Sequence, residues 1–256
     1  MGPNFDINKV KWLQGSHGLP TAYYKLDIPS VTGIINTMVP DPEMEEWIRK
    51  EGKEKVDEIM RLAGYRGIAL YIFLQNFIEN FSKTKDISEA LKVTQTKSPE
   101  ILEKENIPKN KIEEGRNLFY KFYYSEYPSQ YSDVIGTELG IYSPTLFYRG
   151  KLDIFYLNKI FGYTVTDFKT SSDYIKKGSV KEYKYFLQLG AYSNCIDEMY
   201  KEKVNIKRAS ILCINTKLDK LQEIICVGKQ LQEYKEKFKT MTKNFHIKNN
   251  QKYLII

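Results

Sequence analysis

The chain has 256 residues, of which 42% are hydrophobic and 28% charged, proportions typical of a globular protein with a substantial core. No apolar run approaches the ~20 residues that cross a bilayer, and no targeting signal is recognisable at the N-terminus, so we expect no membrane association and a cytoplasmic location in a bacterial or phage-infected cell. The net charge of +7 favours a polyanionic partner.

The scarcity of histidine and cysteine excludes several kinds of site. The chain has two histidines, His17 and His246, so neither a histidine-based metal cage nor a Ser-His-Asp triad is expected. Cys195, Cys213 and Cys226 are widely spaced in apolar sequence. Such cysteines are typical of buried thiols in a reducing compartment, not of a disulfide framework.

The first half of the chain, from about residue 40 to 125, has helical periodicity. Asp41 and Pro42 predict the start of a helix, and Gly64 predicts its end. The pattern then predicts a helix at about 67–81, helix boundaries at Ser98-Pro99 and Ile107-Pro108, and an aromatic-rich helix at about 109–124. The aromatic rings of this last helix could stack on unpaired bases, but packing in the core of a helical lobe is the favoured interpretation.

The second half has short β-branched and aromatic segments separated by turn residues. We expect strands at 134–142, 145–156, 163–169, 209–215 and 221–227, and helices at 180–200 and 229–240. This order predicts an α/β or α+β fold, with a central mixed sheet flanked by helices and a helical N-terminal lobe. We assign residues 1–130 to the lobe and 131–256 to the core of one integrated domain.

Two neighbouring predicted strands carry the residues that suggest chemistry. Residues two apart in a strand share a face, so Asp167 and Lys169 point the same way while Phe168 points into the core. If the strands form a hairpin, Asp153 approaches Asp167, and a hard divalent cation such as Mg²⁺ or Mn²⁺ is the natural occupant between two carboxylates. Lys169 could then orient or deprotonate a water and offset charge on a scissile phosphate. Glu138, on the preceding strand, could add a carboxylate.

An isolated Asp-x-Lys is usually part of a solvated strand face, but here further polar residues follow it at helical spacing. Gln188 and Tyr192 are four apart and share one face of the predicted helix at 180–200. Lys181 and Lys184 lie one or two turns earlier on that face. The complete pattern favours a functional site over a solvated surface.

Residues 138–192 resemble the nuclease core of the RecB-type PD-(D/E)XK exonucleases, in particular the mitochondrial genome maintenance exonucleases and their phage relatives. Upstream, residues 28–35 are similar to the P-S-V-T-x-I-L motif of that group. Trp47, followed later by Tyr65-Arg66-Gly67, is similar to its W…R-G-T-x-x-H helix. The resemblance therefore covers about residues 26–200.

The resemblance implies a restriction-endonuclease-like core and an Mg²⁺- or Mn²⁺-dependent exonuclease acting on single-stranded DNA ends in replication, repair or recombination. It implies metal ligation by Asp153, Asp167 and the Phe168 carbonyl. It makes Lys169 the catalytic lysine, Glu138 an accessory acid and Gln188 the residue that positions the lysine. It implies DNA contacts by Ser30, Arg66, Tyr71 and Tyr192. Independently of the resemblance, Lys151 and the basic run that follows the Asp167-x-Lys169 strand are candidates to meet a phosphate backbone, although the run could also be a solvated face: Lys176, Lys177, Lys181 and Lys184.

The sequence departs from the resembled group at one position and from its iron–sulfur members in another respect. Tyr71 stands where the group has a metal-binding histidine, and since a neutral phenol is a poor Mg²⁺ ligand, we expect a single ion. The iron–sulfur members have four cysteines that bracket the core, whereas this chain has three that do not, so no cluster is expected. Two alternatives remain open: a structure-specific endonuclease on the same core, and a non-catalytic DNA-binding recombination protein, which Tyr71 alone favours.

Overall fold

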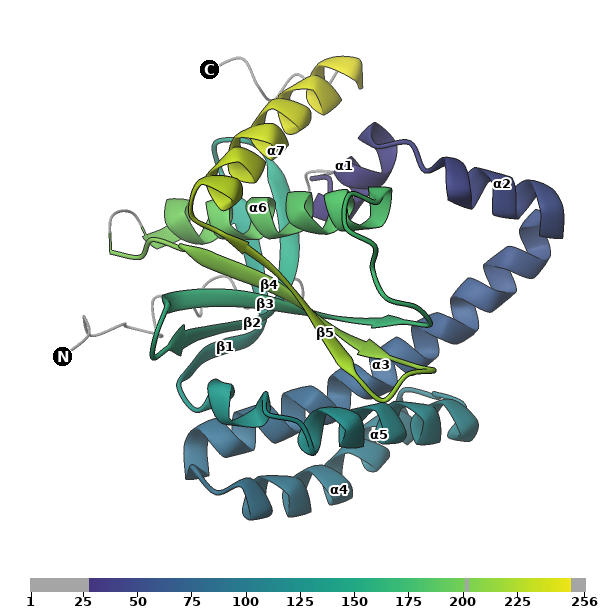
Figure 1. Cartoon of the computed structure of the whole chain (residues 1–256), viewed down its shortest axis with the longest axis vertical. Helices are drawn as coiled ribbons and strands as arrows, with labels where there is room; N and C mark the ends of the chain where they lie inside the picture. Colours follow the sequence, from purple (N-terminus) through teal and green to yellow (C-terminus); the bar gives the residue numbers. More distant parts are fainter. Residues whose placement is uncertain (1–27, 201–202, 250–256) are drawn as a thin grey trace.

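The computed structural model describes residues 28–200 and 203–249. In this part of the chain a five-stranded mixed sheet lies between two layers of helices, with α1, α6 and α7 on one face and α3, α4 and α5 on the other (Figure 1). The expected α+β architecture is confirmed. None of the helices in the described ranges has the length and apolar character needed to cross a membrane.

The helices that precede the sheet are α1 (Val31–Met38), α2 (Pro42–Glu51), α3 (Lys53–Thr84), α4 (Ile87–Lys104), α5 (Lys109–Tyr123) and the short 3-10 helix η4 (Pro128–Tyr131). The periodicity did not predict α1, whose eight residues are too few for a clear pattern. The N-terminus of α1 is set by Ser30, whose hydroxyl accepts a hydrogen bond from the Gly33 amide at 3.0 Å.

Two of the expected helix boundaries are wrong. α3 continues through Gly64, and the break lies at Gly52, whose φ of 83° is a conformation that favours glycine. A glycine inside a helix costs only about 1 kcal/mol, which packing of the second half of α3 outweighs. Likewise α4 continues through Pro99. It is held against α3 there because Asn76 donates a hydrogen bond to the buried Ser98 hydroxyl at 3.0 Å.

The sheet consists of β1 (Val134–Ser143), β2 (Tyr148–Asn158), β3 (Gly162–Ser171), β4 (Arg208–Asn215) and β5 (Leu221–Val227), in that spatial order. β3 and β4 are parallel and are connected through α6 (Val180–Tyr200), whereas the other neighbours are antiparallel. All five strands were expected, but β2 begins later than residue 145 because the preceding turn includes Phe147 with φ 51°.

The last helix, α7 (Gly228–Lys248), is about two turns longer than expected. Its continuation beyond Thr240 buries Thr242 and His246, and the His246 ring nitrogen Nε2 lies 2.9 Å from the Leu146 carbonyl oxygen. Burial of one helical face therefore extends the helix past the point where the charged sequence suggested an end.

Two hydrophobic cores lie on opposite faces of the sheet. One joins α1, α6 and α7 to the sheet, and the other joins α3, α4 and α5 to it. Phe119 and Phe122 of α5 are almost completely buried in the second core, which confirms the packing interpretation for these rings. Phe168 of β3 packs in this same core, as expected. The expected division at residue 130 stays a prediction. The three cysteines are buried thiols, as expected.

Candidate active site

β2 and β3 separate at the two acidic residues. Their ladder runs from Asn158 and Gly162 to Ile154 and Thr166, and the next residue along each strand is Asp153 or Asp167. Beyond this point β2 stays paired with β1, and β3 stays paired with β4. The resulting fork is bridged by the Asp153 carboxylate, whose Oδ2 accepts a hydrogen bond from the Phe168 amide at 2.7 Å.

Asp167 is almost completely buried at the base of the fork. The Gln188 carboxamide donates a hydrogen bond to Asp167 Oδ1 at 3.1 Å and another to the Tyr192 hydroxyl at 2.8 Å. The ammonium of Lys169 forms an ion pair with Asp167 Oδ2. α6 therefore holds the carboxylate in place through Gln188, and Lys169 of β3 neutralises its charge.

The charges at the fork shift one another's protonation. Burial raises the pKa of Asp153 to about 8, and the negative charge of Asp167 adds to the rise. Burial also raises the pKa of Asp167, although Lys169 opposes this. For Lys169, burial alone would lower the pKa, but the two aspartates outweigh it and hold the pKa well above its usual range. An ammonium has no proton-accepting site, so this arrangement favours water orientation and charge compensation by Lys169 over proton abstraction.

The fork opens into a cleft of about 640 Å³ between α3 and the sheet. The sheet contributes the lining residues Glu138, Lys151, Asp153, Phe168, Lys169 and Thr170. Glu138 and Lys151 form an ion pair across β1 and β2. The neighbours of Glu138 pair with Leu152 and Ile154, so Glu138 lies opposite Asp153. Its φ of 49° is left-handed, a conformation that costs a residue with a side chain roughly 1–2 kcal/mol.

Tyr71 reaches the fork from α3. Its hydroxyl lies 3.5 Å from the Asp153 carbonyl oxygen, and the residue lines the same cleft. Burial of the phenol, reinforced by the negative charge of Asp153, holds the pKa of Tyr71 well above its usual range. Tyr71 therefore stays neutral and can donate a hydrogen bond there.

Four of the other expected DNA contacts lie outside the cleft lining. The Ser30 hydroxyl is engaged as the N-cap of α1, and Arg66 faces α5, where it lies 3.6 Å from Glu114. Lys181 donates to the Ser171 hydroxyl at 3.1 Å, and Lys184 forms an ion pair with Asp41 at 2.9 Å. None of these four residues lines the cleft. Their contacts with DNA stay predictions.

Two further residues shape the site, of which Tyr185 was not singled out from the sequence. A Cβ added at Gly150 would lie 2.8 Å from Cε1 of Tyr192, so the buried ring of Tyr192 requires glycine at this point of β2. Tyr185 places its ring centroid 6.0 Å from the Lys169 ammonium, a cation–π geometry that helps to orient the lysine. The signal for Tyr185 was its position three residues before Gln188, on adjoining turns of one helix.

The donor set at the fork can be tested against a divalent cation. Within the described ranges, no group of three or more histidine, cysteine or carboxylate side chains is placed to hold a metal. Mg²⁺ is, however, commonly held by one or two carboxylates, with waters and substrate phosphate completing its shell. Asp153 and Asp167 supply two carboxylates, of which Asp153 lines the cleft and Asp167 lies buried behind it, and the charge of Asp167 disfavours ionisation of Asp153. These residues fit such an ion.

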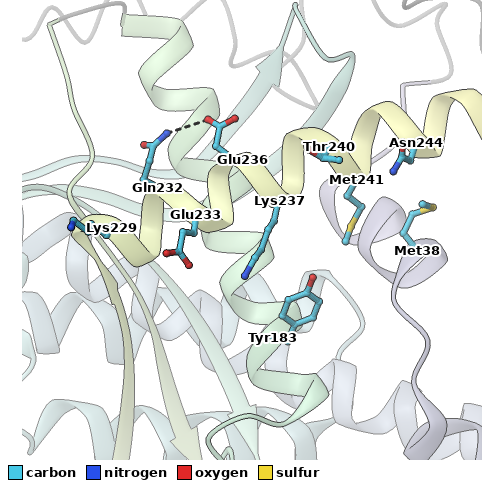
Figure 2. A pocket seen from close by; sticks show the side chains of 10 residues that line it. All are labelled: Met38, Tyr183, Lys229, Gln232, Glu233, Glu236, Lys237, Thr240, Met241 and Asn244. Atoms are coloured by element: carbon cyan, nitrogen blue, oxygen red, sulfur yellow. Dashed lines mark hydrogen bonds between the residues drawn. The ribbon is translucent and has the colours of Figure 1, made fainter.

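A second hollow, of about 810 Å³, lies away from the fork between α1, α6 and α7 (Figure 2). Met38 and Met241 line it from α1 and α7, and Lys237 extends from α7 toward α6, with its ammonium 4.6 Å from the ring centroid of Tyr234. No residue singled out from the sequence lines this hollow. Of these two hollows, only the cleft at the fork is lined by side chains that the sequence predicted to take part in chemistry.

Comparison with known proteins leaves the family of the chain open. No family model matches the sequence, and no curated protein matches it. Among solved structures, the chain is similar to a crystal structure of a Eubacterium rectale protein described provisionally as an exonuclease. The similarity has a TM-score of 0.45 and 15% sequence identity, and covers 96% of this chain and 81% of the other.

Proposed function

We propose that this chain is a metal-dependent deoxyribonuclease with a PD-(D/E)XK core, which hydrolyses phosphodiester bonds at the fork between β2 and β3. The observation that carries the proposal is the position of Asp153 and Asp167 across the fork, with Lys169 paired to Asp167. Two carboxylates and an ammonium at the edge of an open cleft provide the charges that phosphodiester hydrolysis requires. The net charge of +7 supports a nucleic-acid partner.

The roles follow from the contacts. Asp153, Asp167 and the Phe168 carbonyl would hold Mg²⁺ or Mn²⁺, which when bound supplies a polarised phosphoryl oxygen and a more acidic water. Lys169 remains an ammonium and offsets the negative charge that develops on the phosphate. Gln188 fixes the Asp167 carboxylate through its hydrogen bond at 3.1 Å, and is therefore a positioning residue.

The ion pair of Glu138 and Lys151 gives the cleft a further function on substrate arrival. Lys151 is exposed on β2, whereas Glu138 faces the fork beside Asp153. An incoming phosphate competes with Glu138 for the Lys151 ammonium. The carboxylate of Glu138 is then released to accept a hydrogen bond from a water at the fork.

The preference for ends of single-stranded DNA is supported by the sequence resemblance, as is a role in replication, repair or recombination. The test is cleavage of end-labelled linear single strands, linear duplexes and circular single strands with Mg²⁺ or Mn²⁺. We expect shortening of linear single strands and intact circles. Cleaved circles would refute the exonuclease and support the endonuclease on the same core.

The same assay tests the catalytic set. Lys169→Ala should lose cleavage, while Lys159→Ala, which changes an exposed lysine in the β2–β3 turn at the far end of the ladder from the fork, should retain it. DNA binding by the wild-type protein without cleavage of any substrate would refute the enzyme and support the non-catalytic DNA-binding protein.

A further inference from the structure

The two walls of the fork cleft differ in chemical character. The sheet wall carries charged groups, among them Glu138, Lys151 and Lys169. The helical wall carries none: it consists of Ala63, Gly64, Gly67, Ile68, Tyr71, Ile72 and Gln75 of α3 and Ile101 of α4. A ligand that fills the cleft therefore has a charged part and an apolar part on opposite sides.

The apolar part of the wall is exposed although it is made of isoleucines. Ile68 is 46% exposed and Ile101 is 38% exposed, while Ile72 is partly buried beside them. Ile68 and Ile72 are four residues apart and share one face of α3, so they form a continuous surface. Large apolar side chains that line a cleft beside catalytic charges are typical of a ligand-binding wall.

The distance of this wall from the fork is short. Tyr71, between Ile68 and Ile72 in α3, has its hydroxyl 3.5 Å from the Asp153 carbonyl oxygen. One turn of helix rises about 5.4 Å, so Ile68 and Ile72 lie within about one turn of the residue that touches the fork. This is the scale of a single nucleotide.

We propose that the wall formed by Ile68, Ile72 and Ile101 receives the nucleobase that adjoins the phosphate bound at the fork. The proposal rests on the proposed nuclease function, because that function places a phosphate between Asp153 and Lys169. The base leaves its stack in the single strand to reach this wall. The cleft thus selects a nucleotide whose base is unpaired.

Gly67 provides a probe of this wall that does not disturb the fold. It lines the cleft, and a Cβ added there meets no atom within 4 Å. Leucine is a much better helix former than glycine, so Gly67→Leu should stabilise α3 while it fills part of the cleft. Weaker binding by a more stable protein cannot be explained by damage to the fold.

The test compares binding of a short fluorescein-labelled oligodeoxythymidylate with binding of an abasic strand of the same length. Both strands carry the same phosphates, so at equal salt the difference in anisotropy-derived Kd isolates the bases. EDTA is present throughout, which prevents cleavage. The variants are Gly67→Leu, Ile68→Ser and, as matched control, Ile59→Ser, because Ile59 is a 41% exposed isoleucine of α3 outside the cleft lining.

We expect Ile68→Ser to weaken oligodeoxythymidylate binding roughly tenfold, which is about 1.4 kcal/mol. Gly67→Leu should weaken it at least as much. Binding of the abasic strand should be weaker than that of oligodeoxythymidylate in the wild type and unchanged by Ile68→Ser. Ile59→Ser should behave as wild type.

Equal Kd values of the wild type for the two strands, or equal effects of Ile68→Ser and Ile59→Ser, would overturn the base-binding wall. Cleavage by the wild type with Mn²⁺, measured separately, reports on the nuclease proposal. Cleavage without base-dependent binding would refute only the base-binding wall, whereas base-dependent binding without cleavage would refute only the nuclease function. The two failures are therefore distinguishable.

Discussion

Replacing Asp153 by asparagine removes one of the two negative charges at the fork but keeps a side-chain oxygen that can accept the Phe168 amide hydrogen bond. Burial and the charge of Asp167 raise the pKa of Asp153 to about 8, so ionisation of Asp153 is costly in the folded, metal-free protein. We therefore expect Asp153→Asn to be more stable than the wild type when metal is removed.

The pH dependence of this stability difference follows from two pKa values of Asp153: the ordinary value of 3.8 in the unfolded chain and the raised value of about 8 in the folded chain. Below the lower value, Asp153 is neutral in the folded and unfolded chains, and the variant and wild type have similar stability. Between the two values, the unfolded chain loses the proton but the folded chain keeps it, so the wild type loses stability relative to the variant as pH rises. Above about 8 the difference becomes constant.

The difference in the free energy of unfolding between Asp153→Asn and the wild type has an upper limit of about 6 kcal/mol. This limit corresponds to about 1.4 kcal/mol for each pH unit between the two pKa values. Asp153 is partly exposed to the cleft, and solvent there reduces the cost of its charge, so we expect a difference of ~1–3 kcal/mol above pH 8. For a chain of this size, each 1 kcal/mol raises Tm by roughly 2–4 °C.

The assay is thermal unfolding followed by circular dichroism in EDTA at several pH values between acid and mild base. Asp173→Asn, which changes an exposed carboxylate near the end of β3, is the matched control and should follow the wild type. Addition of Mg²⁺ should raise Tm of the wild type more than that of Asp153→Asn. A lower Tm for Asp153→Asn in EDTA above pH 8, or a Tm difference independent of pH, would refute the reasoning.

Four further substitutions test the packing and the site. Gly115→Ala should lower the free energy of unfolding by ~1–3 kcal/mol in urea titrations, because its Cβ would lie 2.5 Å from that of Ala69, whereas Gly64→Ala meets open space and should raise it by up to about 1 kcal/mol. Equal effects would contradict this account of the α3–α5 contact. Gln188→Leu should lower kcat about 10–100-fold with little change in DNA Kd, because it releases Asp167; a change confined to Kd would argue against positioning. Tyr71→His should raise the cleavage rate with Mn²⁺ by adding a nitrogen ligand, and an unchanged rate would show that the phenol does not limit metal binding.

The sheet could be predicted from the sequence because each strand is a short β-branched segment between turn residues. The alternation of Asp167, Phe168 and Lys169 also predicted which side chains share a face, since that follows from strand geometry alone. The point at which β2 and β3 separate could not be predicted. That point depends on where β2 and β3 stop pairing, just beyond the pair of Ile154 and Thr166, and no local sequence pattern encodes it.

The helical wall of the cleft was not predictable for a related reason. Tyr71 and Asp153 are 82 residues apart in the chain, and their contact depends on how α3 packs over the sheet. The predicted helix ends were wrong where packing outweighed local helix propensity. Gly64 and Pro99 are unfavourable in helices, but the contacts of α3 and α4 outweigh that local cost.

The most direct measurement of the central claim is the rate of cleavage of a labelled linear single strand by the wild type, Asp167→Asn and Asp173→Asn, with Mn²⁺ and with EDTA. We predict metal-dependent cleavage by the wild type and by Asp173→Asn, and a loss of roughly a thousandfold or more in Asp167→Asn. Cleavage by Asp167→Asn at the rate of the wild type, or cleavage that persists in EDTA, would contradict the assignment of the fork as a metal-dependent active site.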